Sequence, residues 1–473
     1  MNHIIQTING YLWGLPMIAF LFLTHLFMTV KTGFIQRKTL RAIRLSAKSS
    51  EGDKGDISPF QSLATTLAST LGTGNIVGVG TAVALGGAGA VFWCWITGVF
   101  GMATQYAECL LSVRYRVKNQ KGEFSGGPMY VLSEGLNSKT LGMIYAILAG
   151  VCGLLTGASI QSNAIAGIIK ESAGVRDRNI EVFKGEVSLT GIAVGVVLSL
   201  LTALVVFGGV KKISQVCSFF VPVMAVAYTG GCVAVLFINR SFLADSLVMI
   251  IREAFSLRSV SSGAVGGAML LACRYGVARG LFSNEAGLGT SSVVSASANT
   301  PNPVRQGLVS MTATFWDTVV MCLVTGLVIV STCLAEGSIS MYGEDGGFLC
   351  FKAFSRLPKI GGGLLVFGMI TFAFSTILGW CFTGEKCAEF VMGEKGAYIY
   401  RYLWVAAVLV SPVISFDMVW NLADLFNALL AVPNVYSLVM LSGEVHRLTQ
   451  KYIDNPERVT EKEVVKTKTP DTQ

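Results

Sequence analysis

Two glycine-rich segments place polar residues where an apolar membrane helix would have none. The first runs from Gly72 to Gly80 and includes Thr73 and Asn75. The second contains Gly276, Gly280, Gly287 and Gly289, together with Arg274, Arg279 and Glu285. Glycine frees the backbone to leave the helical conformation, and exposed amides or carbonyls at membrane depth are tolerated only where they line a cavity or bind a ligand. We expect two interrupted helices that form a binding site; close packing by small residues is the alternative.

Ionisable residues inside apolar segments are further functional candidates, because burying a charge in a membrane is costly. They are Glu108, Arg274, Arg279, Glu285, Asp317, Asp417 and Asp424. We expect Arg279, Glu285 and Glu108 to form part of a cytoplasmic gate. Snorkelling or pairing near helix ends is the alternative for several members of this group.

Catalytic and metal-binding constellations are not found in the sequence. His3, His25 and His446 are scattered, and neither HExxH nor GxxxxGK[ST] occurs, so the sequence indicates no enzyme, no ATP-driven pump and no cofactor. The eleven cysteines include no CxxC pair, and most are interpreted as small buried residues. Cys333 and Cys350 flank a predicted outer loop, where a disulfide is conceivable.

The composition then identifies the elements that must position these residues. Of 473 residues, 52% are hydrophobic and 14% are charged, with a mean hydropathy of +0.61, whereas soluble proteins carry about 25% charged residues. Apolar stretches of about twenty residues match a hydrocarbon core of about 30 Å. The net charge of +8 lies in short loops, which favours lipid head groups over nucleic acid as the partner. The chain is therefore predicted to be an all-α polytopic membrane protein.

Eleven apolar runs are predicted to span the membrane. They fall near residues 13–30, 60–83, 90–112, 141–169, 188–207, 214–238, 262–292, 307–333, 360–384, 397–414 and 420–441. Basic residues follow spans one and three, and because such residues stay cytoplasmic, the N-terminus is placed outside and the C-terminus inside. Residues 442–473 are polar and are predicted to be a largely disordered cytoplasmic tail.

The interrupted spans are the second and the seventh, which indicates an internal repeat. Without span one, ten helices divide as five plus five, and the halves have opposite topology because five is odd. Interrupted segments in corresponding positions point to a transporter's binding site. The predicted units are an extra helix with its cytoplasmic loop (1–56), a first repeat (57–260), a second repeat (261–441) and the tail (442–473).

Four motifs in order resemble the alanine/glycine:cation symporter family, often called sodium:alanine symporters. They are Gly72-Thr-Gly-Asn-Ile-Val-Gly78, Gly86-Gly-Ala-Gly-Ala-Val-Phe-Trp-Cys-Trp95, Gly126-Gly-Pro-Met-Tyr130 and Phe282-Ser-Asn-Glu-Ala-Gly-Leu-Gly289. Cys94 stands where the family signature has methionine. The resemblance runs from about residue 10 to 445 and implies a LeuT-like fold, whose inverted five-plus-five repeat agrees with the division above.

The resemblance also implies the substrate site. Family members carry a small neutral amino acid with sodium or sometimes protons. We expect Thr73, Gly74 and Asn75 to hold the carboxylate at a half-helix N-terminus. Open carbonyls at the ends of the interruption in the seventh span, near Cys273 and Gly276, are expected to take the ammonium group.

Two more side chains are candidates for substrate contact. The resemblance implies that Gln161 approaches the substrate, ahead of Asn163, with interhelical hydrogen bonding as the alternative for both. Trp380 is expected to cap the substrate's side chain, and a tryptophan at the membrane interface is its alternative. Carboxamides and a tryptophan around a small cavity favour alanine or glycine.

A sodium site is implied by resemblance to the LeuT-like site. Carbonyls of Ala68 and Leu71 would meet the carbonyl of Phe372 and the hydroxyls of Ser375 and Thr376. Phe372, Ser375 and Thr376 are spaced i, i+3 and i+4, which places them on one helical face. Alternatively, both hydroxyls bond to their own helix.

The sequence therefore predicts a monomeric sodium-coupled importer of alanine or glycine, with D-alanine and serine as further substrates, in a bacterial inner membrane. A proton as coupling ion stays open. A glutamine:sodium symporter of the same family is one alternative. An ion channel is the other, but no repeated filter motif is visible.

Overall fold

The computed structural model describes residues 7–10, 12–47, 56–119, 122–173, 179–182, 185–256, 267–300, 302–414 and 416–454, and these are mostly helical. The first half contains α2 (Leu15–Lys31), η1 (Ile35–Lys38), α3 (Thr39–Ser46), α4 (Pro59–Thr70), η2 (Thr73–Asn75), α5 (Val77–Gly86), α6 (Gly89–Arg114), α7 (Pro128–Tyr130), η3 (Val131–Gly135), α8 (Lys139–Cys152), η4 (Gly153–Ile160), α9 (Gln161–Ala173), α10 (Leu189–Val206) and α11 (Gly209–Ile238). The second half contains η5 (Arg240–Phe242), α12 (Leu243–Ala254), α13 (Gly267–Asn284), α14 (Thr290–Ala296), α15 (Pro303–Thr314), η6 (Phe315–Cys322), α16 (Leu323–Glu336), α17 (Gly346–Ser355), α18 (Gly361–Val410), η7 (Ser411–Val413), α19 (Phe416–Met440) and α20 (Ser442–Asp454).

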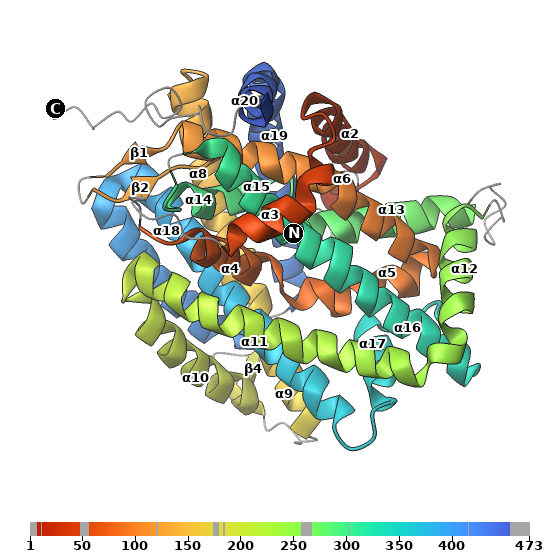
Figure 1. The fold of residues 1–473 in the computed structure, drawn as a ribbon. Helices are drawn as coiled ribbons and strands as arrows, with labels where there is room; N and C mark the ends of the chain where they lie inside the picture. The colour runs from red at the N-terminus through yellow and green to blue at the C-terminus, as the bar shows by residue number, and fades with distance from the viewer. Residues whose placement is uncertain are drawn as a thin grey trace.

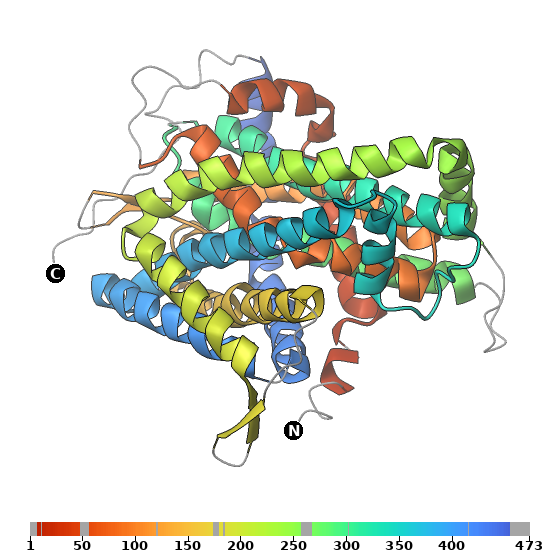
Figure 2. The same ribbon diagram turned by 90° about the horizontal axis from the view of Figure 1, so that it is seen from below.

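Two short antiparallel hairpins interrupt the helices. β1 (Val117–Lys118) pairs with β2 (Phe124–Ser125), and β3 (Asn179–Val182) pairs with β4 (Gly185–Ser188). The β1–β2 hairpin lies at one end of the molecule beside α18, and α12 stands at the other end (Figure 1). The β3–β4 hairpin protrudes from the helical body (Figure 2).

In the part of the chain that the structure describes, six helical segments are long and apolar enough to cross a membrane, or up to eight if each of two bent pairs forms one span. A helix occupies each of the eleven predicted ranges in the part of the chain that the structure describes. The long helix α18 contains two of those ranges, separated by a kink at Gly393 with a φ of 66°. A multi-pass membrane protein is confirmed, whereas the count of eleven crossings and the domain boundaries stay predictions.

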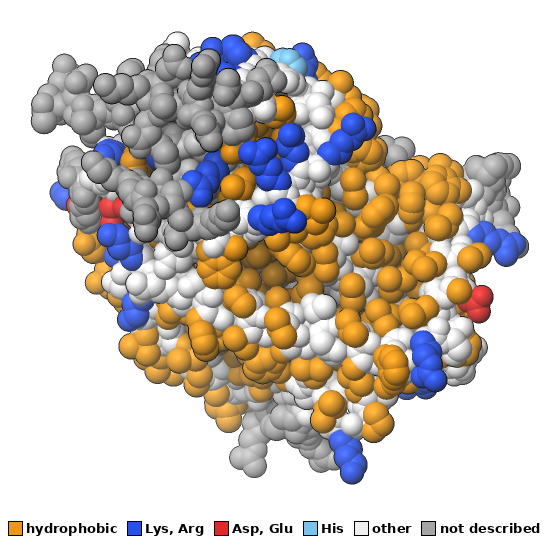
Figure 3. All heavy atoms as spheres, in the orientation of Figure 1, with side chains coloured by type: hydrophobic (Ala, Val, Ile, Leu, Met, Phe, Trp, Pro, Cys, Tyr) orange, Lys and Arg blue, Asp and Glu red, His pale blue; other side chains and the backbone are white. Residues whose placement is uncertain are grey.

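The outer surface separates charge from apolar side chains. Lys and Arg side chains gather over α3 and the upper part of the molecule, and a broad apolar surface lies below them (Figure 3). This surface is suited to lipid tails, because apolar side chains need no hydrogen-bond partner there.

The second predicted span is interrupted as expected. Ser58 caps α4 by accepting from the N–H of Gln61, whose side chain bonds back to the Ser58 N–H. The helix ends at Thr70, and the following residues up to Asn75 form a tight turn before α5 begins. The two halves are bent by 66°, so backbone groups near Gly72 leave the helical ladder.

The seventh predicted span is interrupted at a different place from the one predicted. α13 runs unbroken through Cys273, Gly276 and Gly280, so the expected break there is wrong. A Cβ on Gly276 would lie 2.3 Å from the carbonyl oxygen of Ala90 in α6, and close helix packing therefore explains this glycine. The chain leaves the helix only at Glu285, whose φ is 54°, and Gly287 and Gly289 also have positive φ.

The predicted tail is partly ordered. Residues 442–454 form α20, because Val445 and Leu448 are buried against the helical body while polar residues face outward. This segment was predicted to be disordered, which is wrong for the part that the structure describes. Residues 455–473 lie outside the described residues.

Candidate functional site

A cavity of about 980 Å³ opens beside the first helix break. Its lining includes Thr73, Gly74 and Val77 from the break, Ser172 from α9, Gly347 and Cys350 from α17, Met369 from α18, Arg279 from α13, and Trp420 and Asp424 from α19. The loops beside α9, α17 and the start of α18 are those predicted to lie outside the cell. The cavity therefore connects the first break with the predicted outer face.

Asn75 organises the break without lining the cavity. Its Oδ1 accepts a hydrogen bond of 3.0 Å from the Gly72 N–H, which caps the turn. Its Nδ2 donates to Asp317 Oδ1 at 2.7 Å and to Ser283 Oγ at 2.9 Å. The Oδ1 and the Nδ2 of Asn75 both form hydrogen bonds to protein groups. Asn75 therefore positions Thr73 and Gly74, which do line the cavity.

Gln161 and Asn163 face different surroundings. Gln161 is buried, and Thr73 Oγ1 donates to its Oε1 at 3.4 Å. Asn163 instead donates to the carbonyls of Ser411 and Ile414 at 2.6 and 3.2 Å. The structure brings Gln161 to the first break, its contact with substrate stays a prediction, and Asn163 has the alternative role of joining helices.

Several oxygen atoms of the predicted sodium site lie close together where α18 crosses the end of α4. Thr376 Oγ1 donates to the Leu71 carbonyl at 3.2 Å and to the Phe372 carbonyl at 2.9 Å. Ser375 Oγ bonds to Phe372 of its own helix at 2.9 Å. Ala68 is fully buried one turn before Leu71. Carbonyl and hydroxyl oxygens of this kind are suitable sodium ligands.

The second break is enclosed by carboxylates. Glu108 Oε1 accepts from the Gly287 N–H at 2.8 Å and from Asn434 Nδ2 at 2.7 Å. Asn434 also donates to the Gly287 carbonyl at 2.8 Å. Glu285 accepts a hydrogen bond from the Thr290 hydroxyl. This break is therefore closed by protein groups.

Trp380 belongs to the second break and not to the cavity lining. Its Nε1 donates to Glu285 Oε1 at 3.0 Å, and the side chain is 1% exposed. A Cβ on Gly157 would lie 2.3 Å from Trp380 Cβ. The helical segment η4, which contains Gly157, is therefore in close contact with α18, which contains Trp380. Trp380 is thus not a tryptophan of the membrane interface, and the predicted contact with substrate stays untested.

Arg279 lies apart from the other two predicted gate residues. It lines the cavity with Asp424 and has its guanidinium about 6 Å from the rings of Phe282 and Trp420. Among the ion pairs of the described residues, none joins Arg279 to Glu108 or Glu285. The structure groups the two glutamates at the second break but leaves the arginine about six residues earlier on α13, on the cavity side.

Asp317 is the site residue whose role the sequence did not reveal. Its carboxylate accepts from Asn75, from Ser283 at 2.9 Å and from Thr318 at 2.6 Å, and it is fully buried. It joins the first break to α13 and η6. The only sequence signal was a carboxylate inside an apolar run; its partners are 242 and 34 residues away.

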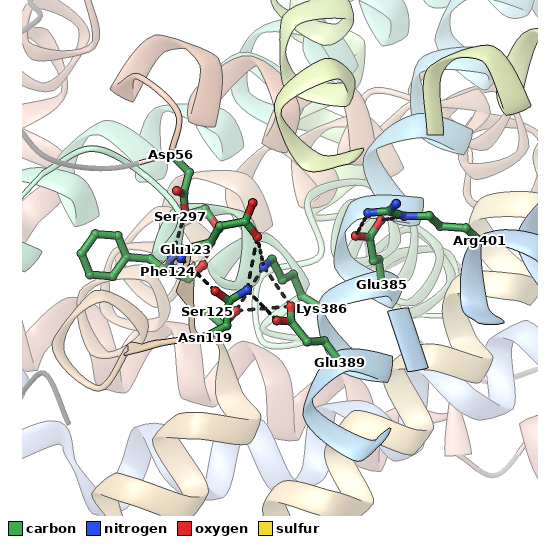
Figure 4. A network of polar contacts seen from close by, with 10 residues as sticks. All are labelled: Asp56, Asn119, Glu123, Phe124, Ser125, Ser297, Glu385, Lys386, Glu389 and Arg401. Atoms are coloured by element: carbon green, nitrogen blue, oxygen red, sulfur yellow. Dashed lines mark hydrogen bonds and ion pairs between the residues drawn. The ribbon is translucent and has the colours of Figure 1, made fainter. Parts of the chain in front are cut away.

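A polar network closes the face opposite the cavity. Lys386 on α18 is 2% exposed and pairs with Glu389 at 2.9 Å and with Glu123 at 3.7 Å, next to the β1–β2 hairpin (Figure 4). Asp56, just before α4, accepts from the Phe124 N–H at 2.7 Å. Partial burial raises the pKa of the Asp56 carboxyl above its usual range, and the nearby Glu123 adds to this shift.

The cysteines and acidic residues give no sign of a disulfide or a metal cluster. Cys333 and Cys350 are both free, so the conceivable bridge between them is not formed. Cys350 Sγ instead donates to the Ile76 carbonyl at 3.2 Å. Over the described ranges, no three His, Cys, Asp or Glu side chains are grouped for a metal ion.

Comparisons with known proteins identify the family of this chain. The sequence pattern of the sodium:alanine symporter family matches residues 1–467. The sodium/alanine symporter AgcS of Methanococcus maripaludis is 39% identical, with 95% of this chain and 96% of that protein covered. GlnT of Bacillus subtilis, described as a probable sodium/glutamine symporter, is 31% identical over 96% of this chain and 91% of its own length.

A solved structure supports the fold. The crystal structure of MhsT in complex with L-phenylalanine aligns with a TM-score of 0.55 at 13% identity, covering 85% of this chain and 99% of that one. At this identity the likeness concerns the fold alone, and it confirms the expected LeuT-like architecture. Since the family pattern covers nearly the whole chain, this protein belongs to the sodium:alanine symporter family.

Proposed function

We propose that this protein imports alanine or glycine together with sodium by alternating access. The observation that carries the proposal is the meeting of Leu71, Thr376 and the cavity at one helix break. A cation bound to the Leu71 carbonyl and the Thr376 hydroxyl would order the turn whose next residues, Thr73 and Gly74, line the cavity. Sodium binding would in this way complete the amino-acid site.

The chemistry of the cavity suits a zwitterion. The backbone N–H groups of Thr73 and Gly74 lie just before α5, where the amides of a helix start lack intrahelical acceptors and attract a carboxylate. Arg279 and the carboxylates of Glu171, Asp345 and Asp424 place charges of both signs at the same cavity. Both signs of charge favour a neutral amino acid over a simple anion or cation.

The closed opposite face favours a carrier over a channel. The Lys386 network ties α18 to the β1–β2 hairpin, and Asp56 extends it to the beginning of α4. Inward opening would require these contacts to separate while the outer cavity closes. We therefore propose that this conformation faces outward, with the N-terminus outside and the C-terminus inside.

Uptake into proteoliposomes tests the proposal. Radiolabelled alanine should accumulate with an inward sodium gradient, and unlabelled glycine should compete. Accumulation of glutamine in place of alanine would identify the second candidate, which the similarity to GlnT favours. Flux that does not saturate and that persists without sodium would contradict symport.

A further inference from the structure

The second break holds two buried carboxylates without a positive partner. Glu285 is 5% and Glu108 is 2% exposed. Within the described ranges, neither forms an ion pair with Lys or Arg. Two uncompensated negative charges are costly in a low-dielectric interior, so such groups are paired, bind a cation or become neutral. The two carboxylates differ in whether a bound proton would find a hydrogen-bond acceptor.

Among the described residues, Glu108 has no hydrogen-bond acceptor beside its free oxygen. Its Oε1 accepts from the Gly287 N–H and from Asn434 Nδ2, and both are donors that cannot accept in return. Its Oε2 has no hydrogen-bond partner in the described structure. A proton on Oε2 would find no acceptor there, whereas the two N–H donors stabilise the ionised form.

The hydrogen bonds of Glu285 fit both the ionised and the protonated form of its carboxyl group. Trp380 Nε1 donates to its Oε1 at 3.0 Å, and Oε2 lies 2.5 Å from the Thr290 hydroxyl. A hydroxyl donates to a carboxylate and, after rotation, accepts from a carboxylic acid. Glu285 can therefore gain a proton at Oε2, keep both partners and donate the new O–H to Thr290, whereas a proton on Glu108 Oε2 would have no acceptor in the described structure.

Unpartnered polar atoms lie on α2 beside the break and on α6 one turn before Glu108. His25 is fully buried, its Nδ1 is 2.8 Å from Thr104 Oγ1, and its Nε2 has no partner. Its Cε1 would be 3.9 Å from a Cβ on Gly287, so the ring faces the break. Both amide atoms of the fully buried Gln105 also lack partners. Buried polar atoms in this condition indicate an unseen water or ion.

Within the described residues, other titratable groups surround Glu285. They are Glu108 from α6, Asp317 from η6, and Tyr145 and Cys152 from α8, with His25 from α2 beside Gly287. Tyr145 donates its hydroxyl to the Leu288 carbonyl at 2.8 Å and helps to seal the break.

We propose that Glu285 is a proton-binding site whose occupancy is linked to the sodium and substrate sites. The link is α18, because Trp380 lies one turn after Thr376 on this helix. An O–H bond forms at Oε2 with a proton taken from solvent, and the same proton returns to solvent later; no other covalent bond changes. The linkage to transport rests on the proposed function, whereas proton binding itself does not.

Tryptophan fluorescence of the purified protein tests proton binding without any substrate. Because the Trp380 indole N–H bonds to Glu285, its emission should change with a single protonation step as the pH is varied across about 5 to 9. The change should be lost in Glu285→Gln, which mimics the protonated side chain, and in Trp380→Phe. It should persist in Thr290→Ser, which keeps the hydroxyl, and in Asp245→Asn, an exposed carboxylate on α12.

Two outcomes would overturn the proton site. One is wild-type emission that does not depend on pH, and the other is an undiminished change in Glu285→Gln. If Glu285→Gln does not fold, Trp380→Phe decides, because retention of the full change there removes Trp380 as its source.

A transport measurement separates this inference from the proposed function. Wild-type proteoliposomes with an entrapped pH indicator should show a lumenal pH change linked to sodium-driven alanine uptake, and the change per transported alanine should disappear in Glu285→Gln. Sodium-driven uptake without any linked pH change in the wild type would overturn the link alone. Wild-type vesicles that take up no amino acid would instead contradict the proposed function.

Discussion

The two helix breaks occupy corresponding places in the predicted repeats but differ in what surrounds them. The first break lies against the cavity, and its Leu71 carbonyl meets the Thr376 hydroxyl. The second is sealed: Glu108 binds the Gly287 N–H, and Glu285 binds Trp380. The first break leaves groups available for ligands, whereas the protein itself satisfies the second.

The comparison shows that glycine is required in the two breaks for different physical reasons. In the first break, glycine avoids a clash with side chains of the candidate site, and no residue there has a positive φ. In the second, Gly287 and Gly289 adopt backbone conformations that L-residues avoid, with φ of 96° and 80°. We expect changes in the first break to impair transport and changes in the second to impair folding or the proton response.

The largest effect should come from glycine substitutions in the two breaks. Gly289→Ala places a Cβ 2.3 Å from Pro128 Cγ at a φ of +80°, which should cost about 2–5 kcal/mol of stability. Gly72→Ala places its Cβ 2.9 Å from Thr376 Oγ1 and should abolish sodium-driven uptake in a folded protein. Thermal unfolding in detergent and uptake measure the two effects.

Gly230→Ala on α11 is the control, because no atom lies within 4 Å of its added Cβ and the residue does not line the cavity. Normal unfolding of Gly289→Ala, or normal uptake by Gly72→Ala, would remove the distinction between the breaks.

Asn75→Ala should have the next largest effect. It removes the cap on Gly72 and a donor to the buried Asp317, and a hydrogen bond to a charged group is worth about 1.5–3 kcal/mol. We expect uptake to fall by about tenfold to a hundredfold. Asn163→Ala, which loses only bonds to the carbonyls of Ser411 and Ile414, should retain most uptake. Equal losses in both variants would argue against a special role for the first break.

Thr376→Ala should act on sodium more than on the amino acid. The hydroxyls of Thr376 and Ser375 both bond to the Phe372 carbonyl of their own helix, but the Thr376 hydroxyl also reaches the Leu71 carbonyl of the first break. Loss of one neutral hydrogen bond, about 0.5–1.5 kcal/mol, predicts a threefold to tenfold higher sodium concentration for half-maximal uptake. Thr376→Ser should recover the wild-type value, and Ser375→Ala should change it less. The sodium dependence of uptake at fixed alanine provides the comparison.

Arg279→Gln should have the smallest effect. Arg279 lines the cavity and forms no ion pair with Glu108 or Glu285 in the described structure. We expect about a twofold to threefold rise in the KM for alanine through weaker attraction at the cavity. A charge exchange between Arg279 and Glu285 should not restore uptake, since the two side chains serve different sites. Restoration by that exchange would revive the three-residue gate.

The sequence predicted those features of the site that depend on local residue types. Gly72, Thr73 and Asn75 marked the first break correctly, because a cluster of glycine and polar residues at mid-span weakens a membrane helix at that point. Gly276 was misread, since a glycine that allows helices to touch looks the same in sequence as one that breaks a helix. Asp317 bonds to Asn75, and Asn434 bonds to Glu108 and Gly287. In each of these three contacts the two residues are more than a hundred positions apart in the sequence. No local pattern encodes such pairings.

The sequence by itself determined the membrane class, the family and the first break, because apolar runs, ordered motifs and helix-breaking residues act within a few turns of chain. Tertiary structure decided which side of each helix faces the cavity, where the second break falls and which carboxylates enclose it. These depend on how α6, α13, α18 and α19 pack together, since burial and hydrogen bonding across helices set the environment of each polar group.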